Sequence, residues 1–562
     1  MYTHKILNIA SGNAHLQNAF SKEIGISSIL AQVLINRGVK NIDEADRFIN
    51  VRLEHLLDPY SFSQMPQASK RIREAARNQE KVMVFGDYDV DGITSLALLK
   101  AALAKVGLHT AHYLPHRVKE GYGLNKNIIA LAKEKNIKLI ITVDCGTNNQ
   151  EEIQELKRQH IDVIITDHHE PINCVLPAAV SILNPKVKGT NYKYRDLAGV
   201  GVAYKLAQAI TEEDLFEELD LVSLGTIADV VPLTGENRII AKEGLKRLSQ
   251  TKRPGLNALI EVSGIKGKSI NSHFVSFILG PRLNASGRMD TAEIAVKLLM
   301  SEDKDDARTF ARIIDTHNRQ RQKIETKILE EAEAIISKEI NFKEHKIIVI
   351  ASEGWHPGVL GIVASKLTDR FYRPSIVISL SDDLCKGSAR SIKNFHLFNA
   401  LSQCRHLLEE FGGHAHAAGL VISKNNIKDF RESINRLARE KLLLEDLLPS
   451  LDIDMELGLE DLNEENIREL QLLEPFGTDN PEPLFFSRNL RIKGEPQVLS
   501  KNTLKFWVTD GTTTYQAIAF GMSGLRDNFT HTAYFDLAYT PRIDTWQGEE
   551  SVILEAKDIF FR

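Results

Sequence analysis

The central part of the chain alternates almost fully apolar runs with segments whose apolar residues have helical spacing. The apolar runs are residues 82–85 (VMVF), 138–143 (KLIITV) and 161–166 (IDVIIT). Residues 92–107 follow the first run and residues 148–160 lie between the other two, and both have the apolar spacing of helices. Strands that are buried on both faces do not alternate apolar and polar residues. The pattern therefore predicts an α/β domain with a parallel sheet covered by helices on both faces.

A second strand–helix region follows a long charged segment. In residues 301–340 the apolar residues fall close to a three–four repeat, which predicts one or two long amphipathic helices that bridge two domains. Apolar runs at 346–352 (KIIVIAS) and 374–380 (PSIVISL) flank a helical segment, and a further helix is predicted at 426–445. We therefore expect a smaller α/β domain over residues 341–448.

The two ends of the chain differ from this centre. From about residue 490 the sequence consists of short alternating strands separated by turn residues, which predicts a small β-barrel or sandwich of about 80–110 residues. The first 80 residues are predicted to be mostly helical and polar, and they carry no recognisable chemistry. The expected domains are thus 1–300, with the first α/β domain, the connecting helix 301–340, the second α/β domain 341–448, and an all-β domain 449–562.

The composition is that of a globular protein and excludes several classes. Of the 562 residues, 43% are hydrophobic and 26% are charged, and the formal net charge is −5, so a nucleic-acid partner would need a local basic patch. The four cysteines (Cys145, Cys174, Cys385 and Cys404) form no CxxC pair, which excludes a disulfide scaffold and a thiolate zinc site and fits a reducing cytoplasm. No apolar stretch approaches the roughly 18 residues of a membrane span, and the N-terminus lacks the apolar core of a signal peptide.

Four clusters of acidic and histidine residues stand out, and three of them directly follow the apolar runs. They comprise Asp87, Asp89 and Asp91 after the first run, Asp144 after the second, Asp167, His168 and His169 after the third, and Asp229 in the segment SLGTIADVVPL. While the backbone stays extended, a period of two directs the first three carboxylates to one side, and Gly92 then lets the chain turn into the next helix. Ligand sites of open parallel sheets lie beyond the carboxyl ends of the strands, so we expect these clusters to converge.

Convergence of four or more carboxylates requires cations, because carboxylates a few Å apart otherwise take up protons. Oxygen-rich ligands with one or two imidazoles suit Mn²⁺ or Mg²⁺. The set is large enough for two ions, and ions about 3.5–4 Å apart are a common device for cleaving phosphate esters or anhydrides. A single Asp-x-Asp-x-Asp could equally be a solvated loop or a helix cap. Its recurrence with similar clusters at strand ends favours a two-metal phosphoesterase.

Four motifs resemble, in order, those of the DHH phosphoesterases: FGDYDVDG, VDCGT, TDHHE and LGTIADVVPL. Within that superfamily the chain resembles the RecJ family of bacterial single-stranded-DNA exonucleases over about residues 50–562, with support from PHRVKEGYGL, LNASGRMDTA, EGWHPGVLGIVASKL, GGHAHAAG and EPFGTDNPEP. The resemblance implies a parallel-sheet DHH domain, a long connecting helix, a smaller α/β DHHA1 domain and a C-terminal all-β OB-fold. The four motifs are intact, so nothing in them suggests an inactive relative.

The same resemblance assigns roles to the acidic clusters. It implies that two ions, Mn²⁺ or Mg²⁺, are bound by Asp87, Asp89, Asp144, His168 and Asp229. Asp91 is either a further ligand or a support for the reacting water. His169 would face the substrate phosphate, and Asp167 would orient its neighbours.

Groups outside these clusters could hold a substrate in the first α/β domain. Arg117 could bind a phosphate through two hydrogen bonds, and Tyr122 offers a face on which a base can stack. The resemblance places their loop on the path of the nucleic acid. It also directs Arg288 to the scissile phosphate, and an Asn-Ala-Ser-Gly turn between Arg282 and Arg288 could expose backbone amides to an anion.

Two segments of the second α/β domain resemble substrate-binding elements of DHHA1 domains. One contains Ser388 and Arg390, and the other contains His414. Taken alone, the first segment is only a basic turn, and the glycines around His414 are as typical of a helix start as of a ligand site. By resemblance, Arg117, Ser388 and Arg390 face one another across a cleft, where they would bind the terminal phosphate of a strand.

These features predict a metal-dependent 5′→3′ exonuclease that hydrolyses single-stranded DNA to 5′-mononucleotides in DNA repair and recombination. Residue chemistry alone reaches a two-metal phosphoesterase, whereas polarity and the preference for single-stranded DNA come from the resemblance. One alternative is a DHH phosphodiesterase or pyrophosphatase for small substrates, against which the OB module argues. Another is an inactive scaffold, against which the intact ligands argue. The expected partners are single-stranded DNA, single-stranded-DNA-binding protein and a repair helicase, and the expected state is a cytoplasmic monomer without membrane contact.

Overall fold

The computed structural model describes residues 5–562 except 118, 173–174, 382, 501 and 547–548, so that Cys174 lies outside the described residues. The chain forms two compact units. The first unit comprises residues 58–229 and 244–449, and the second comprises residues 5–57, 230–243 and 450–562. Among the described residues, no helix is both long and apolar enough to cross a membrane.

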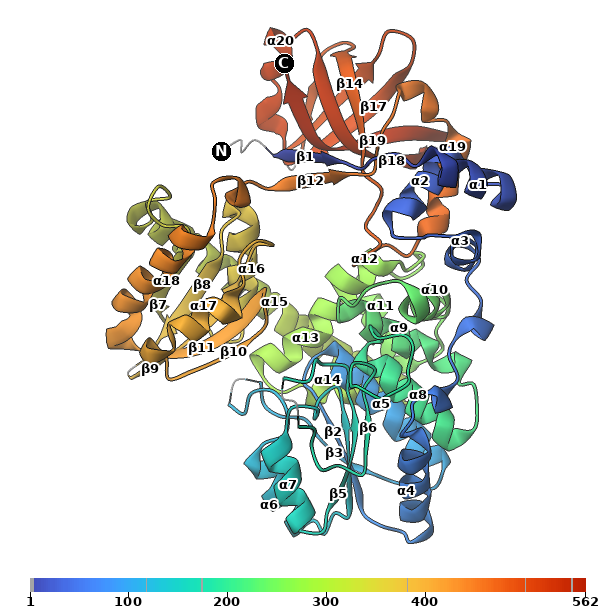
Figure 1. The fold of residues 1–562 in the computed structure, drawn as a ribbon, viewed down its shortest axis with the longest axis vertical. Coiled ribbons are helices and arrows are strands. Elements are labelled where there is room, and N and C mark those ends of the chain that lie inside the picture. Colours follow the sequence, from blue (N-terminus) through green and yellow to red (C-terminus); the bar gives the residue numbers. More distant parts are fainter. Residues whose placement is uncertain (1–4, 118, 173–174, 382, 501, 547–548) are drawn as a thin grey trace. The chain divides into compact units, whose positions relative to one another are not determined.

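The first unit contains the predicted parallel sheet (Figure 1). Its strand order is β3 (Ala111–Tyr113), β2 (Val82–Gly86), β4 (Leu139–Val143), β5 (Asp162–Thr166) and β6 (Ser181–Leu183), and each neighbouring pair is parallel. Helices α6 (Lys126–Glu134) and α7 (Gln150–Arg158) share one apolar core with the sheet. Helices α5 (Val90–Lys105) and α8 (Gly199–Thr211) pack together and contact β2, β4 and β5. The α/β prediction is therefore confirmed, with the acidic clusters at the carboxyl edge of the sheet.

Helices lead from this sheet to the second α/β domain. They include α9 (Leu219–Ala228), α11 (Pro254–Val262), α13 (Gly280–Met289), α14 (Glu293–Leu299) and α15 (Lys304–Glu339), whereas helix α4 (Met65–Arg77) precedes the sheet. The predicted bridge is thus one continuous helix of 36 residues, α15.

The expected Asn-Ala-Ser-Gly turn before Arg288 is wrong, because residues 280–289 are helical and their amides are directed along helix α13. Packing overrides the turn propensity of these residues. The Ser286 hydroxyl is buried and donates to the Leu283 carbonyl at 2.7 Å. Gly287 also lets the helix approach Tyr88, whose carbonyl oxygen lies 3.1 Å from where a Cβ would stand.

The second α/β domain has a mixed sheet. Its order is β10 (Glu410–Gly413), β11 (Ala417–Ser423), β9 (Leu384–Arg390), β8 (Ser375–Leu380) and β7 (Ile348–Glu353). Only β7 and β8 are parallel, and helices α16 (Leu360–Phe371), α17 (Leu397–Gln403) and α18 (Ile427–Lys441) pack on the sheet. A helix start at Gly412 is wrong: the segment is a hairpin, because Gly413 adopts φ 136° next to the backbone of Ala417 and Ala418.

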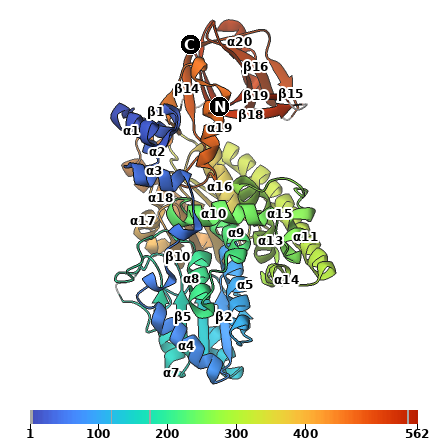
Figure 2. The same cartoon turned by 90° about the vertical axis from the view of Figure 1, so that its right-hand side faces the viewer.

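The second unit is a closed β-barrel with an N-terminal helical segment (Figure 2). The barrel strands are β14 (Phe485–Ile492), β16 (Thr503–Thr509), β17 (Thr514–Phe520), β18 (Phe535–Trp546) and β19 (Glu549–Phe561), and pairing of β14 with both β18 and β16 closes the ring. Short strands β13 (Met455–Glu456) and β15 (Gln497–Leu499) and helix α19 (Glu464–Leu470) complete it. Five strands closed in this way are the architecture of an OB-fold, as predicted.

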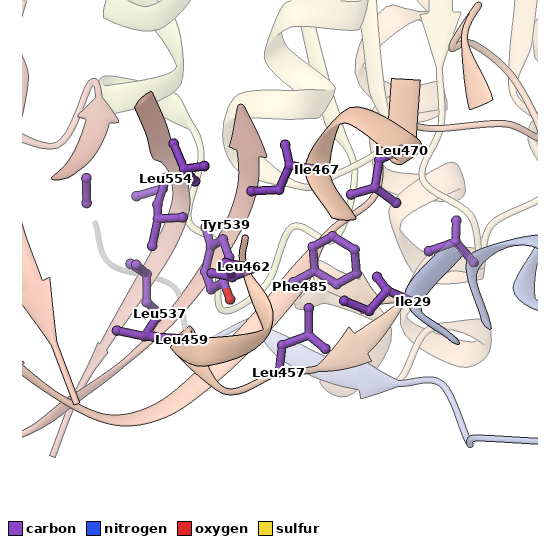
Figure 3. Close-up of a cluster of buried hydrophobic side chains, with 14 of the residues drawn as sticks. Ile29, Leu457, Leu459, Leu462, Ile467, Leu470, Phe485, Leu537, Tyr539 and Leu554 are labelled. Atoms are coloured by element: carbon purple, nitrogen blue, oxygen red, sulfur yellow. The ribbon is translucent and has the colours of Figure 1, made fainter. Parts of the chain in front are cut away.

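The N-terminal segment belongs to the core of this second unit, which its sequence did not indicate. Helices α1 (Ala14–Ile24), α2 (Ser28–Asn36) and α3 (Ile42–Ile49) bury apolar side chains against the barrel, and Figure 3 shows Ile29 in the same cluster as Leu470 and Phe485. Strand β1 (Ile6–Ile9) also pairs in parallel with β12 (Ser450–Ile453). The predicted domain boundaries at residues 300, 340 and 448 remain predictions.

Arg238 joins three segments of the second unit. The residue is 2% exposed, and its guanidinium donates to the carbonyls of Phe48 (2.8 Å), Leu472 (2.8 Å) and Leu473 (2.7 Å). Burial lowers the pKa of Arg238 to about 9. Three carbonyl acceptors compensate for part of the lost hydration of this charge, so residues 5–57 and 230–243 are integral to the unit.

Candidate metal centre

The acidic clusters converge because the topology of the sheet brings their strands together. Strands β2, β4 and β5 are parallel neighbours that end at Gly86, Val143 and Thr166. The residues that follow therefore lie side by side at one edge of the sheet. Asp229 does not follow a strand of this sheet; it is the residue that ends helix α9.

Three sets of ligand atoms lie close enough to bind metal ions. In each set the atoms are within 4.8 Å of one another, and the sets are Asp144 with His168 and His169, Asp91 with His168 and Asp229, and Asp87 with Asp89 and Asp144. His168 Nε2 lies 3.2 Å from Asp144 Oδ1 and 3.4 Å from Asp229 Oδ2. Because Asp144 and His168 each occur in two sets, the arrangement suits neighbouring ions that share ligands.

Unsatisfied buried atoms test whether these residues fit metal ions. Asp87 Oδ1, Asp144 Oδ1 and His168 Nε2 are buried and have no hydrogen-bond partner among the described residues. Leaving such atoms unpaired is costly in a native protein. A cation would satisfy all three atoms, so the centre fits the divalent ions expected from its oxygen-rich ligands.

The electrostatics of the centre lead to the same conclusion. Burial, followed by the charges of neighbouring carboxylates, raises the pKa of Asp87, Asp144 and Asp229 well above the usual value. Burial, followed by the charge of His169, lowers the pKa of His168 to about 3, which keeps its imidazole neutral and its lone pair free for a metal. Divalent cations would allow the carboxylates to ionise together.

Asp91 is fixed by the start of helix α8. Its Oδ2 accepts from the amide of Gly199 at 2.8 Å, and its Oδ1 accepts from the amide of Val200 at 2.7 Å. Burial, followed by the charge of Asp89, raises the pKa of Asp91 to about 7. The expected extended geometry is wrong for Asp91, because helix α5 begins at Val90 with Asp89 as its cap and carries Asp91 in its first turn.

Gly199 is a site residue that sequence reasoning missed. A Cβ at this position would lie 2.8 Å from both Asp144 Oδ1 and Asp91 Oδ2, so only glycine lets the helix approach the carboxylates. The sequence feature that could have indicated this role is the pair Gly199 and Gly201. The pair follows no predicted strand, so it does not suit a dinucleotide-binding fold, and another reason for the glycines was needed. Gly199 instead allows helix α8 to approach an acidic centre, whereas Gly201 makes room for the side chain of Leu197, 2.6 Å from where a Cβ would stand.

Backbone strain accompanies the candidate ligands. Asp144 has φ 60°, and its amide donates to the carbonyl of Thr166 at 2.9 Å. Val230, which follows Asp229, has φ 64° although its side chain is β-branched. Such conformations persist only where surrounding structure enforces them, and they are concentrated at functional sites.

Asp167 organises the third cluster without itself occurring in any of the three ligand sets. Its Oδ1 accepts from the amide of His168 (2.7 Å) and from Nδ1 of His169 (2.8 Å), and its Oδ2 accepts from the amide of Thr147 (2.9 Å). Burial alone would raise the pKa of Asp167, but the charge and hydrogen bond of His169 lower it. Burial likewise opposes the charge of Asp167, which raises the pKa of His169. Asp167 is thus positioned to orient both histidines.

A cavity of about 540 Å³ with several arginines borders the first acidic cluster through Tyr88. Its lining includes Arg117, Arg288, Ser388 and Arg390, so the structure brings together the predicted groups of both α/β domains. The Arg117 guanidinium lies 4.7 Å from the centre of the Tyr88 ring. Tyr88 was not predicted, and its position between Asp87 and Asp89 was the available signal.

Among the described residues, Arg117, Arg288 and Arg390 form no ion pair with a carboxylate, and their charges influence one another. Burial, followed by the charge of Arg117, lowers the pKa of both Arg288, to about 9, and Arg390. Arg288 donates to the carbonyl of Gly358 at 3.0 Å, and Arg390 donates to that of Ala389 at 2.8 Å. Guanidinium groups gathered in this way favour an anionic ligand with more than one charge.

Three predicted substrate groups lie elsewhere. His414 is exposed at the turn between β10 and β11 and does not line this cavity. Tyr122 also lies outside the lining, and its hydroxyl contacts His169 Nδ1 at 2.9 Å. Arg282 is engaged with Asp315 at 3.1 Å, so it is not available as the second arginine of an anion turn.

Three family models match the chain. They are the DHH family N-terminal domain over residues 81–226, the DHHA1 domain over 344–440, and the RecJ OB domain over 453–558.

Curated relatives match over most of the chain. The single-stranded-DNA-specific exonuclease RecJ of Bacillus subtilis is 39% identical over 96% of this chain and 69% of that protein. The protein of the same name from Haemophilus influenzae is 35% identical over 92% of this chain and 93% of that protein.

Solved structures match as well. The crystal structure of RecJ in complex with Mn²⁺ from Thermus thermophilus has a TM-score of 0.85 and 27% identity, covering 99% of this chain and 79% of that one. A second structure, of exonuclease RecJ bound to manganese, has a TM-score of 0.60 and 32% identity and covers 68% of this chain and 98% of that one.

Proposed function

Since the chain belongs to the RecJ family of single-stranded-DNA-specific exonucleases, we infer that its acidic centre hydrolyses phosphodiester bonds of single-stranded DNA with Mn²⁺ or Mg²⁺. The observation that carries this function is the set of three buried ligand atoms that find no hydrogen-bond partner among the described residues, beside a cavity with several arginines. We further propose that the enzyme proceeds from the 5′ end, releases 5′-mononucleotides and acts in DNA repair and recombination.

We propose that the two ions are held by Asp87, Asp89, Asp144, His168 and Asp229. Asp91, in the first turn of helix α5 and fixed by amides at the start of helix α8, would support them. When bound, the ions supply positive charge that activates a water for attack and offsets the charge that develops on the phosphate.

The remaining groups act on the substrate. Arg288, half-buried in the same cavity lining as Tyr88, would bind the scissile phosphate, while Arg117 and Arg390 would bind a neighbouring one. His169 keeps a proton at Nδ1 for Asp167, which leaves Nε2 to face a substrate oxygen. Tyr122 and His414 remain proposed contacts of the DNA strand beyond these phosphates.

Digestion of end-labelled strands tests this function. We expect mononucleotides to be released from 5′-labelled single strands with Mn²⁺ or Mg²⁺ and no release with chelator. Duplex strands of the same sequence are the control and should be cut far more slowly. Release that begins at the 3′ end would refute the proposed polarity, and equal cutting of duplexes would refute the preference for single strands.

The arginine cavity predicts a dependence on the 5′-terminal phosphate. Hydrogen bonds between charged groups contribute roughly 1.5–3 kcal/mol each, so Arg390→Ala or Arg117→Ala should lower kcat/KM about tenfold to a hundredfold on 5′-phosphorylated strands. Strands with a 5′-hydroxyl should be affected much less, because the terminal anion is already absent. Exposed Arg308, which pairs with Asp305 on the surface of helix α15, provides the control variant Arg308→Ala. Equal losses on both kinds of strand would assign these arginines to the scissile phosphate instead.

The barrel predicts a separate contribution to strand binding. A variant containing only residues 58–449 should still cleave short oligonucleotides, because the candidate ligands all lie in the first unit. Its affinity for long strands should fall and depend less on salt, since OB-folds bind single strands through cationic and aromatic groups. Fluorescence anisotropy over a salt series measures both effects, and unchanged affinity and slope would contradict the role of the barrel.

The matching control removes residues 450–562 alone. This deletion would expose the apolar side chains of helix α2, including Leu30 and Leu34, which are fully buried. We therefore expect this variant to aggregate more than the variant that lacks residues 1–57 as well.

We also propose a cytoplasmic, monomeric enzyme that works with single-stranded-DNA-binding protein and a repair helicase. Cys145, Cys385 and Cys404 are buried and form no disulfide with one another, which supports the location. The preference for single-stranded DNA supports the two proposed protein partners, because a helicase produces single strands and a single-stranded-DNA-binding protein covers them.

A further inference from the structure

We propose that Tyr122 is a positioning residue for His169, and that it acts through its hydroxyl group. This inference rests on the proposed function, since it deepens the role of the same site. The hydroxyl lies 2.9 Å from His169 Nδ1 and donates to the backbone carbonyl of Asp144 at 3.2 Å. It therefore connects the histidine that faces the substrate with the loop that carries a candidate metal ligand.

The hydrogen-bond chemistry fixes the direction of each bond. An ionised Asp167 can only accept, so His169 Nδ1, at 2.8 Å from Asp167 Oδ1, must carry the proton. The same N–H then also points to the Tyr122 oxygen, whose own proton goes to the Asp144 carbonyl. His169 is thus held from two sides with Nε2 free of both partners, and the imidazole cannot turn its other nitrogen to the substrate without breaking these bonds.

The backbone around Tyr122 is built to place the hydroxyl. Gly121 and Gly123 adopt φ 80° and 82°, a conformation that glycine reaches without strain. Asn149 binds the loop through Leu124, accepting from its amide at 3.2 Å and donating to its carbonyl at 3.1 Å. A Cβ on Gly123 would lie 2.8 Å from Asn149 Oδ1, so the loop and Asn149 are closely fitted.

The contact between Tyr122 and His169 also affects how much of the Tyr122 ring a DNA base could stack on. The Tyr122 and His169 rings meet edge to face, with centroids 5.1 Å apart and an interplanar angle of 60°. The phenol is 45% exposed, so a base could still reach part of the ring. Positioning of His169 requires the Tyr122 hydroxyl, whereas stacking on a base requires only the ring. The two roles therefore predict different effects of Tyr122→Phe, which removes the hydroxyl, and Tyr122→Ala, which also removes the ring.

Tyr122→Phe separates the two roles. If the hydroxyl positions His169, kcat should fall about tenfold while KM for a 5′-phosphorylated strand changes less than about twofold. In the His169→Ala background the same substitution should cause no further loss, because the group through which it acts is gone. Affinity for Mn²⁺, measured by calorimetry, and affinity for single strands in chelator, measured by anisotropy, should stay at wild-type values.

Tyr60→Phe is the matched control. Tyr60 is 46% exposed in the same unit, and its hydroxyl donates to the carbonyl of Ala209 at 3.3 Å, so loss of this hydroxyl should leave kcat unchanged. The proposal is overturned if Tyr122→Phe keeps wild-type kcat while Tyr122→Ala raises KM, which is the result for stacking. It is also overturned if Tyr122→Phe loses the same factor with and without His169. Failure of the enzyme function itself would be distinct, since wild-type protein would then release no nucleotides.

Discussion

Asp144→Asn is expected to abolish hydrolysis, lowering kcat roughly a thousandfold or more at saturating Mn²⁺. Asp144 occurs in two of the three ligand sets, and its Oδ1 is buried without a hydrogen-bond partner in the part of the chain that the structure describes. Asparagine keeps the size of the side chain and tolerates the φ of 60° at this position, so the loss would reflect the missing charge rather than misfolding. His168→Ala should have a similar effect because it removes the other shared ligand.

Stability measurements make this prediction more specific. Burial and neighbouring carboxylates raise the pKa of Asp144, so at a pH above the ordinary pKa of an aspartate this group lowers the stability of the metal-free fold relative to the unfolded chain. In chelator, Asp144→Asn should therefore melt at the same temperature as the wild type or higher. With Mn²⁺ the wild type should gain stability and the variant should gain much less.

The control for Asp144 is an acidic residue outside the centre. Asp214 is exposed in the same unit, and Asp214→Asn should leave both kcat and the Mn²⁺-dependent stabilisation unchanged. Substantial activity of Asp144→Asn at saturating Mn²⁺ would refute the assignment of Asp144 as a shared ligand.

Gly199→Ala is expected to lower kcat about a hundredfold without unfolding the protein. The added methyl group would lie 2.8 Å from Asp144 Oδ1 and from Asp91 Oδ2, so either the carboxylates or the start of helix α8 must move. Alanine is favoured over glycine in helices by about 1 kcal/mol, which partly offsets the steric cost to the fold. Calorimetric affinity for Mn²⁺ should fall together with kcat, because the ligands themselves are displaced.

Gly524→Ala is the matched glycine control. A Cβ at Gly524 would meet no atom of the described residues within 4 Å, and Gly524 does not have positive φ. We expect wild-type activity and wild-type Mn²⁺ affinity for this variant. If Gly199→Ala also behaved like the wild type, the close approach of helix α8 would have no part in shaping the centre.

The sequence by itself determined the parallel sheet and the residues at its carboxyl edge. Fully apolar runs can only be strands that are buried on both faces or buried helical segments, and their length favours strands. Because parallel strands end at one edge, Asp87, Asp144 and His168 had to converge once the sheet was recognised. These conclusions depend on local pattern and on topology, which neighbouring residues along the chain encode.

Only the tertiary structure decided how residues distant in sequence complete the centre. The amides of Gly199 and Val200 donate to Asp91, which lies more than 100 residues earlier in the sequence. The residues around either position do not indicate this contact. Packing also made a helix of the segment that ends at Arg288, where the local residues favour a turn.

Contacts between residues distant in sequence also explain why the packing of the N-terminal segment and the role of the Tyr122 hydroxyl could not be predicted. Residues 5–57 were predicted to be a mostly polar helical sequence, but their apolar side chains pack in one core with the barrel, more than 400 residues later in the chain. The hydroxyl of Tyr122 meets His169 because a loop with two glycines at positive φ brings it there. Side-chain contacts between distant segments depend on how the whole chain packs, and local periodicity and composition do not encode them.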